Sequence, residues 1–192
     1  MARRLRTVKA VGTLRRRRAY HAIRRALRAT WGRSHFRIVH ISIQREHIHL
    51  VCEANDKIAL ARGMQSFQIS AAQQLNAAVA QDRGHTVARK GTVFPERYHV
   101  EHLTSPRQVR NSIAYCLNNW RRHGDDVGEL RQAQIDPFAS GILFDGWKRS
   151  YPFIPPEGYE PLVTMYPQTW LLEFGWRRHG RIDPFETPGP AL

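Results

Sequence analysis

The chain has 192 residues, of which 42% are hydrophobic and 10% aromatic, so it is long enough to bury a core and too apolar for a disordered protein. Its two cysteines, Cys52 and Cys116, exclude a disulfide framework and favour a reduced compartment. No apolar run reaches the roughly 18 residues that span a bilayer, and the basic N-terminus lacks the apolar stretch of a signal peptide. We therefore expect a soluble cytoplasmic protein with no membrane partner.

Positive charge is concentrated at the N-terminal end of the chain. Residues 1–45 contain 14 Lys/Arg and no acidic residue, whereas the other 16 basic residues are balanced by all 16 acidic ones, so the net charge of +14 comes from this first quarter. Most of these basic residues are arginines, whose planar guanidinium binds phosphate through paired hydrogen bonds. This distribution predicts a polyanionic partner, nucleic acid first of all. The candidate backbone contacts are Arg15, Arg16, Arg17, Arg18, Arg24, Arg25 and Arg28.

The first expected elements are a short strand at residues 7–11 and an arginine-rich helix at about residues 14–30. One apolar stripe on this helix can dock on a sheet or, as the weaker alternative, lie on a membrane surface. The stripe consists of Tyr20, Ile23, Leu27 and Trp31.

A predicted hairpin and a long helix follow. Residues 36–43 ("FRIVHISI") and 47–54 ("HIHLVCEA") are β-branched apolar runs joined by a short link, which predicts two antiparallel strands. Asp56 can cap a helix that runs to about Gln81 and stops near Gly84. The apolar stripe of this helix is Leu60, Met64, Phe67, Ala71, Leu75 and Ala78.

The remaining elements complete an α+β pattern. "TVARKGTVFPERYHVEHL" predicts a strand pair that turns near Gly91, and Ser105 with Gln108 forms a capping box for a helix that ends at Gly124. A proline-rich, loop-like segment comes next and contains one short basic helix, "QTWLLEFGWRRHG". We therefore predict an antiparallel sheet with helices packed on it in residues 1–124, and a loop-rich extension in residues 125–192.

The second strand of the hairpin carries two histidines on one face. Residues i and i+2 of a strand point the same way, so His47 and His49 lie side by side while Ile48, Leu50 and Cys52 face the core. Two imidazoles at this spacing can bind a metal ion, but a pair is only half a site. Without further ligands, two solvent-facing polar residues are the simpler interpretation.

The capped helix offers the missing groups. Its packing stripe runs through Val109, Ile113 and Trp120, so Tyr115 falls on the other side. Near a metal-bound phosphate this phenol is a candidate nucleophile, although its ordinary pKa near ~10 requires a strongly polarised phosphate. Asn119, one turn further on, points the same way and can supply a third, oxygen ligand.

These motifs together resemble a known family. "HIHL", followed some 65 residues later by "YCLNN" on a helix, is similar to the HUH single-tyrosine transposases, and closest to the REP-associated tyrosine transposases and their insertion-sequence relatives. "GTVFPERYH" between the two motifs also resembles that family. The resemblance extends from about Phe36 to Gly124.

The resemblance implies a ferredoxin-like (RRM-like) sheet with the histidine pair on a central strand. His47 and His49 would bind Mg²⁺ or Mn²⁺, with Asn119 as third ligand, and Tyr115 would attack single-stranded, hairpin-containing DNA. The product would be a 5′-phosphotyrosine and a free 3′-OH, and the function site-specific DNA cleavage and rejoining in transposition. Relatives are bacterial, cytoplasmic and nucleoid-associated, and work as homodimers or monomers.

Three alternatives stay open at this point. A non-catalytic RRM-like nucleic-acid-binding module would need stacking aromatics on the open sheet face, where the two strands offer few. The second alternative is that the protein is an inactive, domesticated relative of these transposases, and the intact His-His-Tyr set argues against it. A hydrolytic zinc site could recruit His40, His99 or His102, but would need an acid or histidine in place of Asn119.

Overall fold

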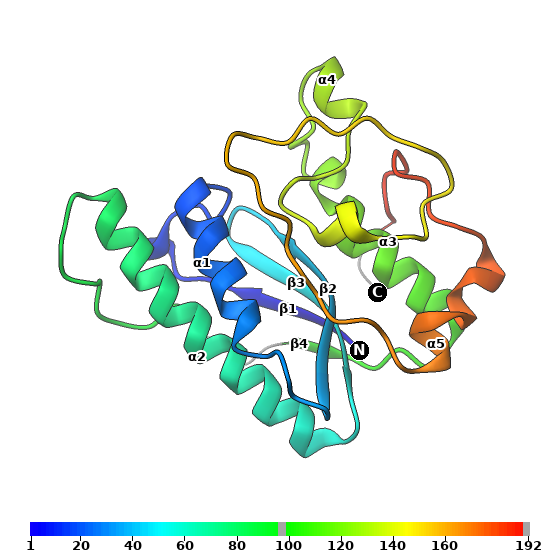
Figure 1. Cartoon of the computed structure of the whole chain (residues 1–192), viewed down its shortest axis with the longest axis horizontal. Coiled ribbons are helices and arrows are strands. Elements are labelled where there is room, and N and C mark those ends of the chain that lie inside the picture. The colour runs from blue at the N-terminus through cyan, green and yellow to red at the C-terminus, as the bar shows by residue number, and fades with distance from the viewer. Residues whose placement is uncertain (96–98, 190–192) are drawn as a thin grey trace.

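The computed structural model describes residues 1–95 and 99–189, and its centre is a four-stranded antiparallel sheet (Figure 1). The strands are β1 (Ala2–Arg6), β2 (Phe36–Ile43), β3 (His47–Ala54) and β4 (His99–Glu101), in the order β2-β3-β1-β4. With α1 (Arg17–Arg28) after β1 and α2 (Lys57–Asp82) after β3, this is the ferredoxin-like arrangement of an α+β fold. The predicted fold class is confirmed.

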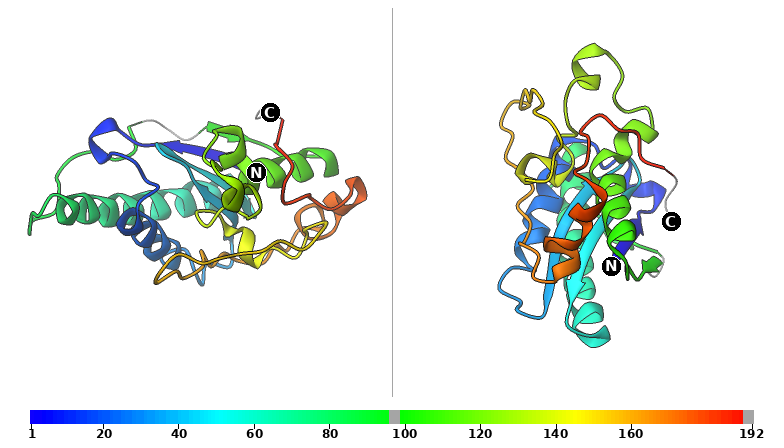
Figure 2. Two further views of the ribbon diagram at one scale, coloured as in Figure 1. Left: turned by 90° about the horizontal axis from the view of Figure 1, so that it is seen from above. Right: turned by 90° about the vertical axis from the view of Figure 1, so that its right-hand side faces the viewer.

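The two faces of the sheet are covered by different elements, as both views of Figure 2 show. Ile48, Leu50 and Cys52 of β3 belong to the core formed with α1 and α2. Val51, which points the other way, belongs to a second core built on α3 (Pro106–Arg122). Every residue of β2 is buried, including Arg37, His40 and Ser42, because both faces of this strand are covered.

Four predicted elements agree closely with the structure. β2 and β3 occupy the predicted residues and pair antiparallel, and the stripe of α2 from Leu60 to Ala78 is buried. The Asp56 side chain accepts a hydrogen bond from the Ala59 N–H at 2.7 Å, and the capping box of Ser105 and Gln108 is formed. The arginine helix exists but is shorter than expected, spanning Arg17–Arg28.

The predicted first strand at residues 7–11 is wrong. The strand is β1, directly before it, and Lys9–Val11 is a 3₁₀ turn (η1) that ends at Gly12, where φ is 76°. β1 pairs with β3 in a register that sets Arg4 opposite His49 and Arg6 opposite His47. Its three arginines hide the strand pattern, because only Leu5 contributes an apolar side chain to the core.

The predicted strand pair around Gly91 is also wrong. Residues 85–95 form a loop beside the end of α2, where the Arg89 N–H donates to the Asn76 carbonyl at 3.1 Å. Val93 is the one buried apolar anchor of this loop, and its carbonyl accepts from the Val8 N–H at 2.9 Å. β4 is the only strand of that segment in the described residues, and residues 96–98 of the quoted stretch lie outside them.

Residues 125–189 wrap around α3 and the β2 edge of the sheet. They contain α4 (Glu129–Gln132), η2 (Ser140–Leu143), α5 (Trp170–Glu173) and η3 (Gly175–His179). The predicted basic helix is split into α5 and η3 at Gly175, where an added Cβ would lie 2.6 Å from the Trp170 ring. Ile135, Trp147 and Trp176 enter the same core as α3, so this extension is packed onto the α3 face of the sheet. The boundary at residue 124 itself stays a prediction.

Candidate active site

Helix α3 brings Tyr115 to the histidine pair of β3. The helix is anchored through its apolar stripe, in which Val109, Ile113 and Trp120 are each at most 2% exposed. The ring of Tyr115 meets the edge of the His49 ring, with centroids 5.1 Å apart. The Cys116 thiol, the next residue along, lies 3.8 Å from the His49 carbonyl and holds the helix against the strand at this point.

Four rings form a continuous row across this crossing. Tyr115 contacts His49, His49 contacts His47 with centroids 4.7 Å apart, and His47 contacts His123 with centroids 5.6 Å apart. Tyr115 and His123 are eight residues apart on and just after α3, or about 12 Å along a helix. The row therefore runs along the helix, with the histidine pair in its middle.

Burial keeps both histidines neutral at physiological pH. It lowers the pKa of His47 to about 4, and the neighbouring His123 and Arg4 act in the same direction. Burial also lowers the pKa of His49 well below its ordinary value, with further contributions from His47 and Arg4. A neutral imidazole has a free lone pair, which is the form that binds metal.

Asn119 lies between Tyr115 and His123 along α3 and is fully buried. Neither its amide oxygen nor its amide nitrogen has a hydrogen-bond partner among the described residues, and the same holds for Nε2 of His49. Buried polar atoms of this kind are normally paired, so the unpaired amide of Asn119 and Nε2 of His49 are candidate ligand atoms. Two imidazoles and an amide oxygen suit a divalent cation that completes its shell with phosphate oxygens and water.

The residues that the structure describes contain no cluster of three His, Cys, Asp or Glu side chains able to hold a metal ion. The alternative of a zinc site completed by another histidine or acid therefore finds no support in them.

Arginines surround the tyrosine. Burial raises the pKa of Tyr115, while Arg122 and Arg4 oppose that shift. The phenol is therefore protonated at neutral pH, and as a nucleophile it would require a phosphate whose charge is neutralised. Arg4 lies on the same face as its cross-strand partner His49, so it can contribute to that neutralisation.

A cavity of about 620 Å³ opens beside the tyrosine. His49, Tyr115, Arg3, Arg4 and Arg110 are among the residues that line it. The segment from Glu186 to Gly189 forms its outer wall, held there by an ion pair of 2.7 Å between Arg110 and Glu186. The cavity has room for a nucleotide next to Tyr115.

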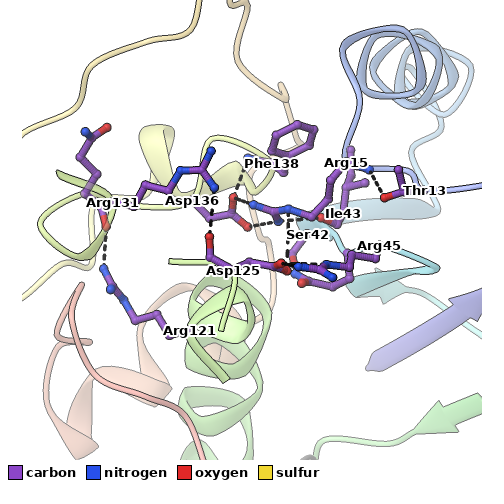
Figure 3. Close-up of polar contacts among 12 residues, drawn as sticks. Thr13, Arg15, Ser42, Ile43, Arg45, Arg121, Asp125, Arg131, Asp136 and Phe138 are labelled. Carbon is purple, nitrogen blue, oxygen red and sulfur yellow. Dashed lines mark hydrogen bonds and ion pairs between the residues drawn. The ribbon is translucent and has the colours of Figure 1, made fainter. Parts of the chain in front are cut away.

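The arginines predicted as DNA contacts lie on α1 or directly before it, and α1 packs on the face of the sheet opposite α3 (Figure 1). Arg15 is engaged inside the protein, where it donates to Asp136 at 2.8 Å and to the Ile43 carbonyl at 3.0 Å (Figure 3). Arg24 pairs with Glu160 at 2.5 Å. The exposed members are Arg16, Arg17, Arg18, Arg25 and Arg28. Their contact with DNA stays a prediction.

Two residues of this neighbourhood were missed in the sequence. Arg4 precedes the predicted first strand, and His123 lies at the end of the capped helix, next to Gly124. The spacing of His123, eight residues after Tyr115, places both residues on one face of a helix and could have indicated it. Arg4 becomes visible only through the pairing register of β1 with β3.

The model of the family described as IS200-like transposases matches residues 7–119 of the chain. The match includes the histidine pair, Tyr115 and Asn119. The chain belongs to the IS200-like transposase family. This transposase is therefore an enzyme that acts on DNA in transposition, and members of the family are generally metal-dependent. The comparisons with curated proteins and with solved structures found no match. No helix in the described part of the transposase is long and apolar enough to cross a membrane.

Proposed function

We propose that this transposase cleaves and rejoins single-stranded DNA at specific sites through a covalent bond between Tyr115 and a 5′-phosphate. The observation that carries the proposal is the contact of the Tyr115 ring with His49, whose Nε2 is buried without a partner. The proposed nucleophile, Tyr115, is thus in direct contact with an imidazole whose Nε2 lone pair can bind a metal ion. The substrate is single-stranded and hairpin-containing DNA, as the family resemblance implies.

His47, His49 and Asn119 would hold Mg²⁺ or Mn²⁺. When bound, the ion polarises the scissile phosphate and reduces its negative charge. The neutral state of both histidines supports this role, because no proton has to leave before the ion binds. Asn119 contributes an oxygen but no charge, so we expect modest metal affinity.

Tyr115 attacks phosphorus from the side of the large cavity. Its hydroxyl proton passes to solvent as the bond between Oη and phosphorus forms, and Arg4 and Arg122 stabilise the negative charge that develops. The bond between phosphorus and the 3′ oxygen breaks, and that oxygen takes up a proton. One phosphodiester replaces another, so a second 3′-hydroxyl can reverse the step without ATP.

A pool of single-stranded oligonucleotides with flanking hairpins tests the proposal. The transposase is incubated with the pool and Mn²⁺ or with EDTA, boiled in SDS, and the DNA still attached to protein is sequenced. We expect attached DNA only with the metal, joined through its 5′ end and enriched in one sequence next to a hairpin. Adducts formed equally well in EDTA would rule out the metal role, and breaks without attached protein would rule out the tyrosine mechanism.

A further inference from the structure

A second cavity, of about 460 Å³, lies at the other end of the histidine pair. His47 and His123 form its inner wall, whereas His49 and Tyr115 line the first cavity. The rest of the wall comes from the turn after β1 and the link before β3, including Lys9, Thr13 and Arg45. The row of four rings thus joins two cavities, one at each end.

We propose that this second cavity holds the DNA strand that ends in the 3′-hydroxyl. The proposal rests on the proposed function. In a displacement at phosphorus, the attacking and leaving oxygens lie roughly in line, on opposite sides of the phosphorus. Tyr115 is at one end of the row, so a phosphate above His47 and His49 directs its 3′ oxygen toward His123 and the second cavity.

The charges in this cavity suit a DNA strand. Its two carboxylates are already neutralised by arginines: Asp125 pairs with Arg45 at 2.7 Å, and Glu46 pairs with Arg6 at 3.4 Å. Figure 3 shows Asp125 beside Arg45 and the buried Arg15, whose Nε lies 3.9 Å from the same carboxylate. Lys9 is exposed and has no carboxylate within ion-pair distance among the described residues. Its ammonium group is therefore available for a phosphate of the strand.

The remaining walls suit the sugar and base of the last nucleotide. The exposed ring of His123 offers a surface on which a base can stack, and the Thr13 hydroxyl can accept or donate a hydrogen bond. Holding this strand after cleavage keeps its 3′-hydroxyl in line with the phosphotyrosine. In rejoining, that hydroxyl loses its proton to solvent, its oxygen bonds to phosphorus, and Tyr115 recovers its proton as the bond to Oη breaks.

Photocrosslinking to the full-length Tyr115→Phe protein tests where each strand end lies, independently of catalysis. One probe is a short oligothymidine with 4-thiothymidine at its 3′ end and a free 3′-hydroxyl. The other carries a 5′-phosphate and 4-thiothymidine at its 5′ end. We expect the 3′-end probe to crosslink to residues 7–13, 44–47 or 123, and the 5′-end probe to residues 110–116 or 186–189.

Matched lysine variants give the second readout. Lys9→Gln should lower the crosslinking yield of the 3′-end probe about tenfold, the effect of losing one charge-assisted contact, and leave that of the 5′-end probe unchanged. Lys57→Gln, an exposed lysine at the start of α2, should change neither yield. The proposal is overturned if the 3′-end probe labels the Tyr115 cavity or only α1, or if Lys9→Gln lowers both yields equally. Failure of the wild-type protein to form a covalent adduct would instead overturn the proposed function.

Discussion

At the residue scale, the state of the two histidines follows from their place under α3. His49 is 7% exposed and is covered by the Tyr115 ring, so protonation would place a charge where water cannot solvate it. Its Nε2 has no hydrogen-bond partner among the described residues, so this nitrogen is available to a cation. The same burial that disfavours the imidazolium therefore prepares the ring for a metal.

Replacement of His49 by alanine should abolish specific metal binding. In a calorimetric titration with Mn²⁺, we expect His49→Ala to weaken binding by at least about tenfold, because one of three protein ligands is lost. His35→Ala is the control, since His35 is exposed and lies on the loop before β2. Equal affinity of wild type and His49→Ala would disprove the metal assignment.

The stability of the protein should decrease in mild acid. Burial lowers the pKa of His40 to about 4, below the roughly 6.5 of a histidine in the unfolded chain. Between these two pKa values only the unfolded chain binds the proton. The free energy of unfolding therefore decreases as the pH is lowered, by at most about 1.4 kcal/mol per pH unit for this residue.

Urea unfolding of His40→Phe checks this prediction. The variant removes the titrating ring but keeps an aromatic group beside Phe144, whose centroid is 5.3 Å from that of His40. The difference in the free energy of unfolding between about pH 7 and pH 5 should be smaller in His40→Phe than in the wild type. His47 and His49 contribute to this difference in both proteins. An identical difference in both proteins would contradict the assignment to His40.

At the element scale, the accuracy of the sequence predictions depended on how much information each element carries within itself. β2, β3, α2 and α3 have continuous periodicity or side-chain caps, and all four lie close to their predicted bounds. β1 contains one apolar core residue, Leu5, and is a strand only because β3 and β4 pair with it. Tyr115, His47 and His49 follow from local periodicity, whereas Arg4, the wall at residues 186–189 and the second cavity depend on pairings across the whole chain.

Gly63 sets the distance between α2 and the sheet. A Cβ at this position would lie 2.1 Å from the buried Phe36 ring, so α2 and β2 can approach only at a glycine. In an exposed helix Gly→Ala stabilises by roughly 1 kcal/mol, but here we expect Gly63→Ala to destabilise by about 1–3 kcal/mol. Chemical denaturation measures the sign directly. Combining the change with Phe36→Leu should recover part of the loss, and a stabilised Gly63→Ala protein would contradict the packing.

At the scale of the whole molecule, the positive charge of residues 1–45 is divided between the two faces of the sheet. Arg3, Arg4, Lys9 and Arg45 line the two cavities beside the histidine pair. The exposed arginines of α1 lie on one side of the sheet, and α3 with the Tyr115 cavity lies on the other. Residues 125–189 connect the two sides, since Arg15 next to α1 pairs with Asp136 and the Glu53 carboxylate of β3 accepts hydrogen bonds from the Gln168 and Thr169 N–H groups. A DNA strand that used both regions would have to pass around an edge of the sheet.

The salt dependence of DNA binding tests whether α1 takes part. Binding of single-stranded DNA should weaken steeply with salt, because each neutralised phosphate releases counterions. Changing Arg16, Arg17 and Arg18 together to serine should reduce the slope of log binding constant against log salt concentration, by up to the equivalent of about three phosphate contacts. The exposed Arg62→Ser on α2 should leave this slope unchanged. Arg15 is kept, because its ion pair with Asp136 is part of the fold. A slope unchanged in the triple variant would exclude this segment from the interface.

The proposed mechanism depends on a covalent bond between Tyr115 and the 5′-phosphate of DNA, and Tyr115→Phe removes the oxygen that would form it. The Tyr115 hydroxyl makes no hydrogen bond to any described residue, and the apolar stripe of α3 lies on another side of the helix. The free energy of unfolding of the variant should therefore lie within about 1 kcal/mol of that of the wild type. The wild-type protein is incubated with Mn²⁺ and DNA that carries the cleavage site, then denatured and digested. Mass spectrometry locates the attached nucleotide on the peptides. We predict a 5′-linked nucleotide on the peptide of Tyr115 in the wild type, and neither adduct nor cleavage with Tyr115→Phe. Cleavage by the folded variant would contradict this prediction, because the nucleophile would then be water or another residue.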